Sequence, residues 1–525
     1  MIKANSSLNS ESPAMLLSAI LLASCATTGS SSDAASSEVI ADQMSAADFR
    51  AYGQTSPEVV ETHIGELSFT EGGFAGGYPT LDSVDLLVDE MDFQRATQGY
   101  LWALPLVSYA EWLRAHEETF NAADGQLVKY TSMLAKQGIL TGNATTPYVI
   151  GFADLVRTGP LVFDVPEGPS AGIIDDMWQR GVRDFGVSGP DAGKGVKFVI
   201  LAPGVEVPAD LDESEFVVVR NSTNIVFLGI RALQADPEEA QAMLNKFQTY
   251  PYADRANPKK LEMLEVSDDV TWGQWQPHGM AYWESLKKVM DREVFEERDR
   301  FILCMLEGLG VRLDREFAPD ERQSRLLKEA AVVGEAMAKA NTFSKSFEGI
   351  DLYKGTHWDQ LMIVNVDDRA EHVDQMYRRA AFTWEAVTRG KAYYIEKPGI
   401  GQQYRTAYND GSGEFLTGSR HYTLTMPPNP PAKTFWSIVV YDVNTRTLIL
   451  NGEGRPAASS RTGLQAEEDG TVTVHFGPTQ PEEAPASNWI QTNPGESWFT
   501  YLRFYGPTEA YFDQSYPLQD IQRAD

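Results

Sequence analysis

The segment Lys197-Phe198-Val199-Ile200-Leu201 is a short, mostly apolar run of residues that favour β-strands. Three similar runs lie within residues 147–231, separated by glycine and proline: 161–165, 216–219 and 225–228. Runs this apolar are typical of strands covered on both faces, as in the interior of a β-sandwich. Residues 147–231 therefore indicate a first β-sandwich-like region.

A second β-rich region is expected from about residue 394 to the C-terminus. Apolar and polar residues alternate there in 421–426 and 471–476, which is the pattern of antiparallel strands with one face in a core. Residues 236–392 instead carry apolar side chains at helical spacing, as at Leu326, Leu327 and Ala330. The part between the two β-rich regions is therefore predicted to be mainly helical.

Helices are also expected before the first β-rich region. Residues 45–66 show helical spacing, and a second helix can be capped by Asp82 and end before Pro105. The predicted fold is α+β, with two mainly antiparallel β-sandwich-like domains, a helical N-terminal lead and a helical segment between the domains. The predicted parts are a signal peptide (1–24), a Ser/Thr-rich tether (25–44), the lead and first sandwich (45–235), the connector (236–393) and the second sandwich (394–525).

The N-terminus has the features of a lipoprotein signal. A ten-residue, mostly apolar run covers 14–23. The segment Leu22-Ala23-Ser24-Cys25 ends this run, and a Ser/Thr-rich stretch follows. Such signals are cut before the cysteine, which is acylated, so the mature protein would begin at Cys25. A secretory signal that needs no cysteine and an ordinary buried helix are the alternatives. Lys3 is the only positive charge before the run, and Glu11 offsets it.

This signal also predicts where the protein resides. The apolar run is too short for a bilayer core, which needs roughly 20 residues, so a lipid on Cys25 is the expected anchor. Ala26, rather than aspartate, follows the cysteine, which in a Gram-negative cell favours the outer membrane, facing the periplasm or the cell surface. Cys304 lies in an apolar helical run and is expected to be a buried, inert thiol.

The charge of the chain limits its partners. The chain has 44 Lys and Arg against 74 Asp and Glu, a net charge of −30. Such a chain repels nucleic-acid backbones, so no DNA or RNA partner is expected. Attachment to anionic lipid through basic patches is not expected either.

Several short motifs occur in order along most of the chain. In the N-terminal half they are Gly76-Gly77-Tyr78-Pro79-Thr80, Tyr100-Leu101-Trp102-Ala103-Leu104-Pro105, Gly159-Pro160-Leu161-Val162 and Asp184-Phe185-Gly186. In the C-terminal half they are Phe435-Trp436-Ser437, Tyr441-Asp442, Asn488-Trp489 and Leu502-Arg503-Phe504-Tyr505-Gly506-Pro507. Through them the chain resembles bacterial proteins that pair domain-of-unknown-function families 1254 and 1214, as a lipoprotein-like member. The resemblance implies two β-sandwich-like parts in an exported or membrane-anchored protein, and it implies no established activity.

Aromatic residues around an arginine are the best candidates for a ligand site. A strand over 499–505 would place Tyr501, Arg503 and Tyr505 on one face, where they could line a groove for a polar or cyclic ligand. The alternative is that Arg503 is a buried anchor paired with a carboxylate such as Asp442. Two tryptophans present a similar choice between a sugar platform and a core side chain: Trp436 and Trp489.

A pair of carboxylates is the other route to function, because many glycosidases use two, roughly 5 to 10 Å apart. Asp164, inside an apolar run, and Asp176, beside Trp178, are the least surface-like acids; a capping or turn role is the alternative for each. The seven histidines show no metal-binding spacing, and residues 189–195 depart from a phosphate-binding loop. No metal or other cofactor is therefore expected.

The leading hypothesis is a cell-envelope lipoprotein that binds a small polar or saccharide ligand between its β-sandwich domains. The alternatives are an envelope hydrolase that uses a carboxylate pair and a structural protein that oligomerises through the sandwiches. The sequence leaves open whether the protein is an enzyme. The expected partners are the membrane, through the lipid anchor, and the small ligand, with a homo-oligomer as a further possibility.

Overall fold

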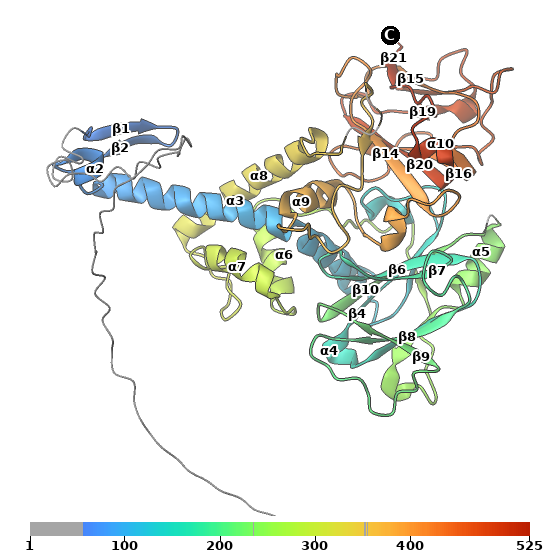
Figure 1. Ribbon diagram of the computed structural model, residues 1–525, viewed down its shortest axis with the longest axis horizontal. Coiled ribbons are helices and arrows are strands. Elements are labelled where there is room, and N and C mark those ends of the chain that lie inside the picture. The colour runs from blue at the N-terminus through green and yellow to red at the C-terminus, as the bar shows by residue number, and fades with distance from the viewer. Residues whose placement is uncertain (1–55, 235, 351–352, 354, 525) are drawn as a thin grey trace, which may run out of the picture. The chain divides into compact units, whose positions relative to one another are not determined.

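The computed structural model describes residues 56–234, 236–350, 353 and 355–524. Cys25, the predicted signal and tether, and residues 45–55 of the first predicted helix lie outside them. The chain divides into two compact units, Met1–Ser83 and Val84–Asp525. The predicted α+β class is confirmed: a long helix precedes the first of two β-rich regions, and further helices lie between the regions along the chain (Figure 1).

The described part of the first unit contains a hairpin. Strands β1 (Val59–Thr62) and β2 (Gly65–Ser68) pair antiparallel, and a one-turn helix, α2 (Gly73–Gly76), follows. The prediction that a helix continues to residue 66 is therefore wrong. The Thr62 hydroxyl donates a 2.7 Å hydrogen bond to the carbonyl of Gly65, and Gly65 has a φ of 121°, which residues with a side chain rarely adopt. The turn thus favours a hairpin.

Helix α3 (Leu81–Arg114) runs through Pro105, where the sequence predicted its end. Proline removes one helical hydrogen bond and crowds the preceding turn. The hydroxyl of Tyr282 donates a 2.7 Å hydrogen bond to the carbonyl of Tyr100 in that turn, and residues 100–109 are all buried. Packing therefore outweighs the local effect of the proline. The helix begins before Asp82, which lies in its first turn and is not its cap.

The first β-rich region is a sandwich of two sheets with the orders β12-β3-β4-β10-β6-β7 and β11-β5-β8-β9. Strands pair antiparallel except for the pairs β12–β3 and β8–β9. Side chains such as Ile174 and Leu228 from the larger sheet pack against Phe163 and Phe198 from the smaller one. All four apolar runs of the sequence are strands here. The bounds are β3 (Val128–Tyr130), β4 (Tyr148–Asp154), β5 (Leu161–Val165), β6 (Ser170–Asp176), β7 (Gly181–Gly186), β8 (Val196–Leu201), β9 (Phe216–Arg220), β10 (Ile225–Ala232), β11 (Gln248–Pro251) and β12 (Leu264–Glu265).

The second β-rich region also has two sheets, with the orders β13-β14-β20-β16-β17 and β19-β18-β15-β21. Their facing side chains, among them Leu424, Phe476, Ile438 and Leu502, form one core. The opposite face of the five-stranded sheet packs through a separate cluster that contains Tyr501. The bounds are β13 (Asp359–Gln360), β14 (Gln402–Ala407), β15 (Tyr422–Met426), β16 (Ala432–Asp442), β17 (Ala457–Ser459), β18 (Val472–Gly477), β19 (Trp489–Gln491), β20 (Trp498–Pro507) and β21 (Gln522–Arg523).

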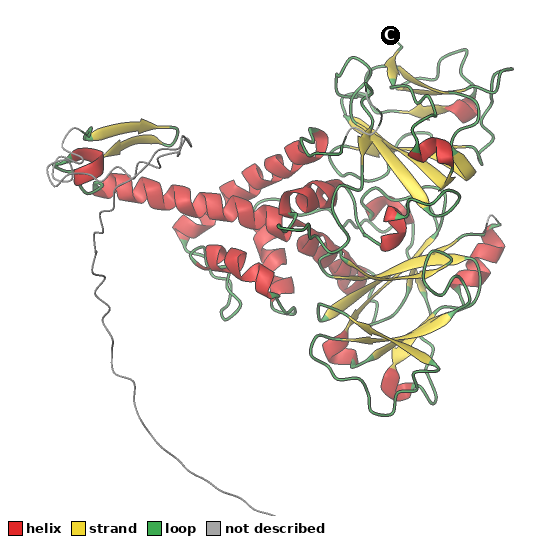
Figure 2. Cartoon of the chain, in the orientation of Figure 1, coloured by secondary structure: helices red, strands yellow, loops and turns green. Residues whose placement is uncertain are grey.

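Most helices of the second unit gather in one group beside the sheets (Figure 2). Cys304 lies on the exposed side of α7, whose buried side chains are Ile302 and Leu306, so the prediction of a buried thiol is wrong. No helix within the described ranges is long and apolar enough to cross a membrane. The remaining helices are α4 (Leu155–Thr158), α5 (Pro237–Leu244), α6 (Met280–Met290), α7 (Arg300–Glu307), α8 (Glu321–Phe343), α9 (Met376–Glu385) and α10 (Glu509–Phe512). The short helical turns are η1 (Ala115–Thr119), η2 (Ala135–Gly138), η3 (Tyr252–Asp254), η4 (Glu297–Asp299), η5 (Lys391–Tyr394) and η6 (Ala486–Asn488).

Candidate functional site

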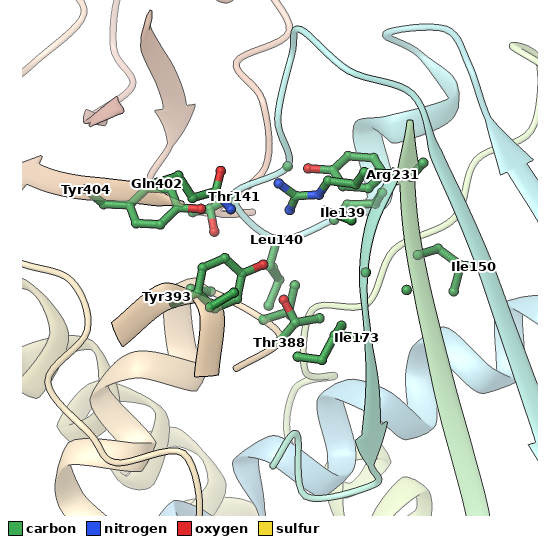
Figure 3. A pocket seen from close by; sticks show the side chains of 18 of the residues that line it. Ile139, Leu140, Thr141, Ile150, Ile173, Arg231, Thr388, Tyr393, Gln402 and Tyr404 are labelled. Carbon is green, nitrogen blue, oxygen red and sulfur yellow. The ribbon is translucent and has the colours of Figure 1, made fainter. Parts of the chain in front are cut away.

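A cavity lies where three parts of the second unit meet (Figure 3). Its walls are one face of the six-stranded sheet, the segment that follows α9, and the sheet that carries β14 and β20. About 120 Å³ is open to the centre of a water molecule, which at roughly 10–15 Å³ per water is room for several waters or one small organic molecule. Its apolar side chains include Ile139, Ile150, Ile173, Phe227 and Phe382.

Alternation along three neighbouring strands builds the first wall. Ile150 on β4, Ile173 on β6 and Phe227 on β10 lie on one face of the sheet, while the residues between them point into the sandwich core. Gly229 comes next on this face of β10. A Cβ atom there would lie 2.9 Å from the ring of Phe227 and 3.3 Å from Ile173, so the glycine keeps this part of the wall open. Arg231 follows in the same phase and lines the cavity.

Strand β20 builds the opposite wall, with the alternation that the sequence predicts. Leu502 and Phe504 belong to the core of the second β-rich region, whereas Tyr501 and Arg503 line the cavity. Tyr505 lies on the same face but is not among the lining residues. Its ring is stacked on that of another aromatic residue of the sheet, with the ring centres 3.9 Å apart.

Arg503 is a buried cation that is held by neutral groups. The side chain is only 3% exposed, and its Nη2 donates to the Tyr441 hydroxyl at 2.6 Å and to the carbonyl of Thr141 at 2.8 Å. Its guanidinium carbon lies 5.4 Å from the ring centre of Tyr404. Asp442 makes no ion pair with it, nor does any other carboxylate in the described part of the chain lie within 4 Å. The alternative of a buried anchor is thus correct about burial and wrong about the carboxylate.

The loop 139–143 ties the first β-rich region to the second beside the cavity. The Tyr441 hydroxyl, which accepts from Arg503, donates to the carbonyl of Gly142 at 3.0 Å. Asn143 donates from Nδ2 to the hydroxyl of Tyr505 at 2.6 Å. These hydrogen bonds run directly between the two regions, so they hold the walls of the cavity at a fixed separation.

Arg231 is the second arginine of the cavity. Its guanidinium carbon lies 4.7 Å from the ring centre of Tyr148. Among the residues that the structure describes, none accepts a hydrogen bond from this guanidinium, and none places a carboxylate within 4 Å of it. Figure 3 shows the side chain extending into the cavity toward Thr141, with Tyr393 and Tyr404 across the space.

Asp184 is the remaining charged residue of the lining. Its oxygens accept hydrogen bonds from the backbone N–H groups of Lys391 and Ala392, at 2.9 and 3.4 Å. Burial raises the pKa of this carboxyl above its ordinary value, although the two backbone hydrogen bonds act in the opposite direction. Asp184 therefore positions η5, and no arginine of the described ranges forms an ion pair with it within 4 Å.

The two candidate catalytic acids lie on different sheets, and neither lines the cavity. Asp164 is half-buried on β5, opposite Lys197 on β8, and burial raises its pKa. Asp176 is 1% exposed at the end of β6. It accepts hydrogen bonds from the backbone N–H groups of Trp178 and Arg180 and from the Arg180 side chain. Asp176 thus has the turn role that was its alternative.

The two candidate tryptophans are core side chains. Trp436 is 5% exposed in the core of the second β-rich region. Trp489 is 6% exposed, and its indole donates to the carbonyl of Gly477 at 3.2 Å. Neither ring lines the cavity, so of the five predicted ligand-binding residues, only Tyr501 and Arg503 meet there.

Sequence reasoning missed Arg231 and the aromatic residues around it. A signal was present, because Arg231 continues the alternation Phe227–Gly229 at the end of an apolar strand. A charged residue at a position whose alternation predicts burial indicates that this part of the sheet face is not an ordinary hydrophobic core. The contribution of Tyr148 and Thr141 had no comparable signal, since they reach the cavity through tertiary contacts.

Comparisons with known proteins agree with this division into two regions. A family model described as "Protein of unknown function (DUF1254)" matches residues 125–251, and one described as "Protein of unknown function (DUF1214)" matches residues 401–509. The chain carries both regions in tandem. The DUF1254 region supplies Arg231 and Thr141 to the cavity, and the DUF1214 region supplies Tyr404, Tyr501 and Arg503.

Solved structures of similar proteins include two without an assigned function. The VPA0106 protein from Vibrio parahaemolyticus is 19% identical, with a TM-score of 0.48 over 83% of this chain and 100% of its own. An uncharacterised protein from Burkholderia cenocepacia is 11% identical, with a TM-score of 0.39 over 85% of this chain and 98% of its own. No curated protein matches the chain.

Proposed function

We propose that this protein binds a small polar or saccharide ligand in the cavity between its DUF1254 and DUF1214 regions, and that it does so as a lipid-anchored protein of the cell envelope. The observation that carries the binding function is the cavity itself, which both regions line. Its lining combines tyrosines and two arginines with apolar side chains such as Ile150, Ile173 and Phe227. Convergent polar groups in a mostly apolar cavity are typical of small-molecule sites.

A hydrolase that uses Asp164 and Asp176 has less support. The two acids belong to different sheets, and Asp176 is committed to its own turn and to Arg180. In a glycosidase the two carboxyl groups flank one substrate bond, roughly 5 to 10 Å apart. We therefore favour binding over hydrolysis.

Binding is tested by thermal unfolding of the full chain in the presence of glycans and small polar molecules. A ligand at a hundred times its Kd stabilises the folded state by about 2.7 kcal/mol. Ile173→Trp fills the cavity and should remove the shift of any ligand that binds there. Val156→Trp is the control, because Val156 is 67% exposed and outside the cavity. A stabilising ligand that is unaffected by Ile173→Trp, in a variant with a native near-ultraviolet circular dichroism spectrum, would place binding elsewhere.

The envelope location rests on Leu22-Ala23-Ser24-Cys25 and on the Ser/Thr-rich stretch after it. Metabolic labelling with a fatty acid, followed by membrane fractionation, tests it. The wild-type chain should be labelled and sediment with membranes, and Cys25→Ala should lose the label. Equal labelling of both chains, or a mature protein that keeps Met1, would show that Cys25 is not the anchor.

A further inference from the structure

The cavity carries an excess of positive charge inside a protein whose net charge is −30. Three lining residues are charged: Arg231, Arg503 and Asp184. Asp184 already accepts hydrogen bonds from two backbone N–H groups. Neither arginine has a carboxylate within 4 Å in the described part of the chain. The cavity thus holds two cations that no acid among the described residues neutralises by contact.

Arg231 has fewer partners than two other arginines that lack an acid. Arg405 and Arg446 are buried without a carboxylate partner, but each donates a hydrogen bond to a glutamine oxygen. The Arg231 side chain donates no hydrogen bond to a described residue, and its guanidinium carbon lies 4.7 Å from the ring centre of Tyr148. A cation over a tyrosine ring is a modest interaction. Its N–H donors face the cavity (Figure 3). Leaving such donors unmatched is unfavourable away from bulk water.

The second arginine also has unused donor capacity. Both hydrogen bonds of Arg503 come from Nη2. Its Nη1 donates no hydrogen bond to a described residue, and neither does its Nε, which is fully buried. A planar guanidinium presents donors in a fork that matches the oxygens of a carboxylate or a phosphate. An anion in this cavity would supply both the acceptors and the negative charge that the described residues do not.

The rest of the lining suits an apolar body. Ile150, Ile173 and Phe227 lie on the sheet wall, and Phe382 and Val387 come from the segment at the end of α9. A free inorganic ion would leave this apolar part of the cavity unfilled. A small organic acid with an aliphatic or aromatic body would bury apolar surface there and place its charged group near the arginines.

We propose that the cavity binds a small organic anion whose carboxylate or phosphate is held by Arg231 and Arg503; this rests on the ligand-binding function proposed above. The anionic group accepts hydrogen bonds from Arg231, beside Tyr148, and the apolar body lies against Ile173 and Phe227. Arg231 is then the residue that selects an anion over a neutral molecule of the same shape.

Isothermal titration calorimetry of the full chain tests the selection. The probes are benzoate, hexanoate and phenyl phosphate, with benzamide and hexanamide as neutral counterparts. The test variant is Arg231→Gln, which removes a guanidinium that donates no hydrogen bond to a described residue. Arg461→Gln is the matched control, because Arg461 lies 3.9 Å from the ring centre of Phe435, is exposed and is outside the cavity.

At least one acid should bind wild type and Arg461→Gln with equal affinity, and its amide about 30-fold more weakly or not at all. Arg231→Gln should lower the affinity for the acid by about 30-fold or more. The melting temperature of this variant should stay within a few degrees of that of the wild type. Tighter binding of phenyl phosphate than of benzoate would identify phosphate as the group. Equal binding of acid and amide, or full acid binding by Arg231→Gln, would overturn the anion while leaving the binding function standing. If neither these probes nor the broader screen bind in the cavity, the binding function itself fails.

Discussion

His116 should make the folded protein lose stability between pH 7 and pH 5. The side chain is 2% exposed in η1, and its Nε2 lies 2.9 Å from the hydroxyl of Tyr130. The same hydroxyl accepts a 2.9 Å hydrogen bond from the indole of Trp112. The Tyr130 hydroxyl can donate its one proton to Nε2 while it accepts from the indole, an arrangement that suits a neutral imidazole. Burial accordingly lowers the pKa of His116 to about 3.

The size of the effect follows from linkage. In the unfolded chain this imidazole has an ordinary pKa of 6.5, so below that pH the unfolded state takes up a proton that the folded state does not. The stability present above pH 6.5 is lost as the pH falls toward the folded-state pKa. Between pH 7 and pH 5 the loss is about 2 kcal/mol.

Urea unfolding followed by tryptophan fluorescence at pH 7, 6 and 5 measures this loss. His116→Phe keeps a buried ring and removes the titration; it loses one hydrogen bond, worth about 1 kcal/mol, at every pH. His372→Gln is the control, because the His372 side chain is 83% exposed. The wild type and the control should each lose about 2 kcal/mol more than His116→Phe over this range. Parallel curves for all three proteins would refute the assignment of a neutral, buried imidazole.

Two further substitutions test the packing and the turn that position the cavity. Leu502→Ala should lower the free energy of unfolding by about 2–5 kcal/mol, because Leu502 is fully buried. Val156→Ala, at an exposed site, should change this free energy by less than about 0.5 kcal/mol. Equal losses for the two variants in chemical denaturation would contradict this prediction. Asp176→Asn should cost about 2–3 kcal/mol, since Arg180 keeps its second acid, Glu296, at 2.5 Å. Calorimetry should find the affinity of a cavity ligand unchanged in Asp176→Asn, and a selective loss of binding or turnover at wild-type stability would restore the acid as a functional residue.

The local patterns of the sequence predicted the elements of the second unit better than those of the first. The apolar runs around Phe163 and Phe198 are strands because β-branched and aromatic side chains pack on both faces of a sheet inside a sandwich. The helix predicted over 45–66 is wrong over its described residues, where the turn at Gly65 joins two short strands. The end predicted at Pro105 is also wrong, because burial and the Tyr282 hydroxyl stabilise the turn before the proline.

The candidate site was predictable only as a face of one strand. The two-residue alternation of a strand predicted that Tyr501 and Arg503 share one face, and both line the cavity. Trp436 and Trp489 were indistinguishable from ligand platforms by residue type, since the same ring can fill a core or stack on a sugar. Their burial decides for the core.

The sequence by itself determined the α+β class, the order of the two families and the alternation of β20. These depend on periodicity and on motifs, which are local. Only the tertiary structure decided that Arg231 and Arg503, 272 residues apart by their numbers, line one cavity, with no carboxylate of a described residue within 4 Å of either guanidinium. No local pattern records which charges lack a partner, because pairing is a property of the assembled fold.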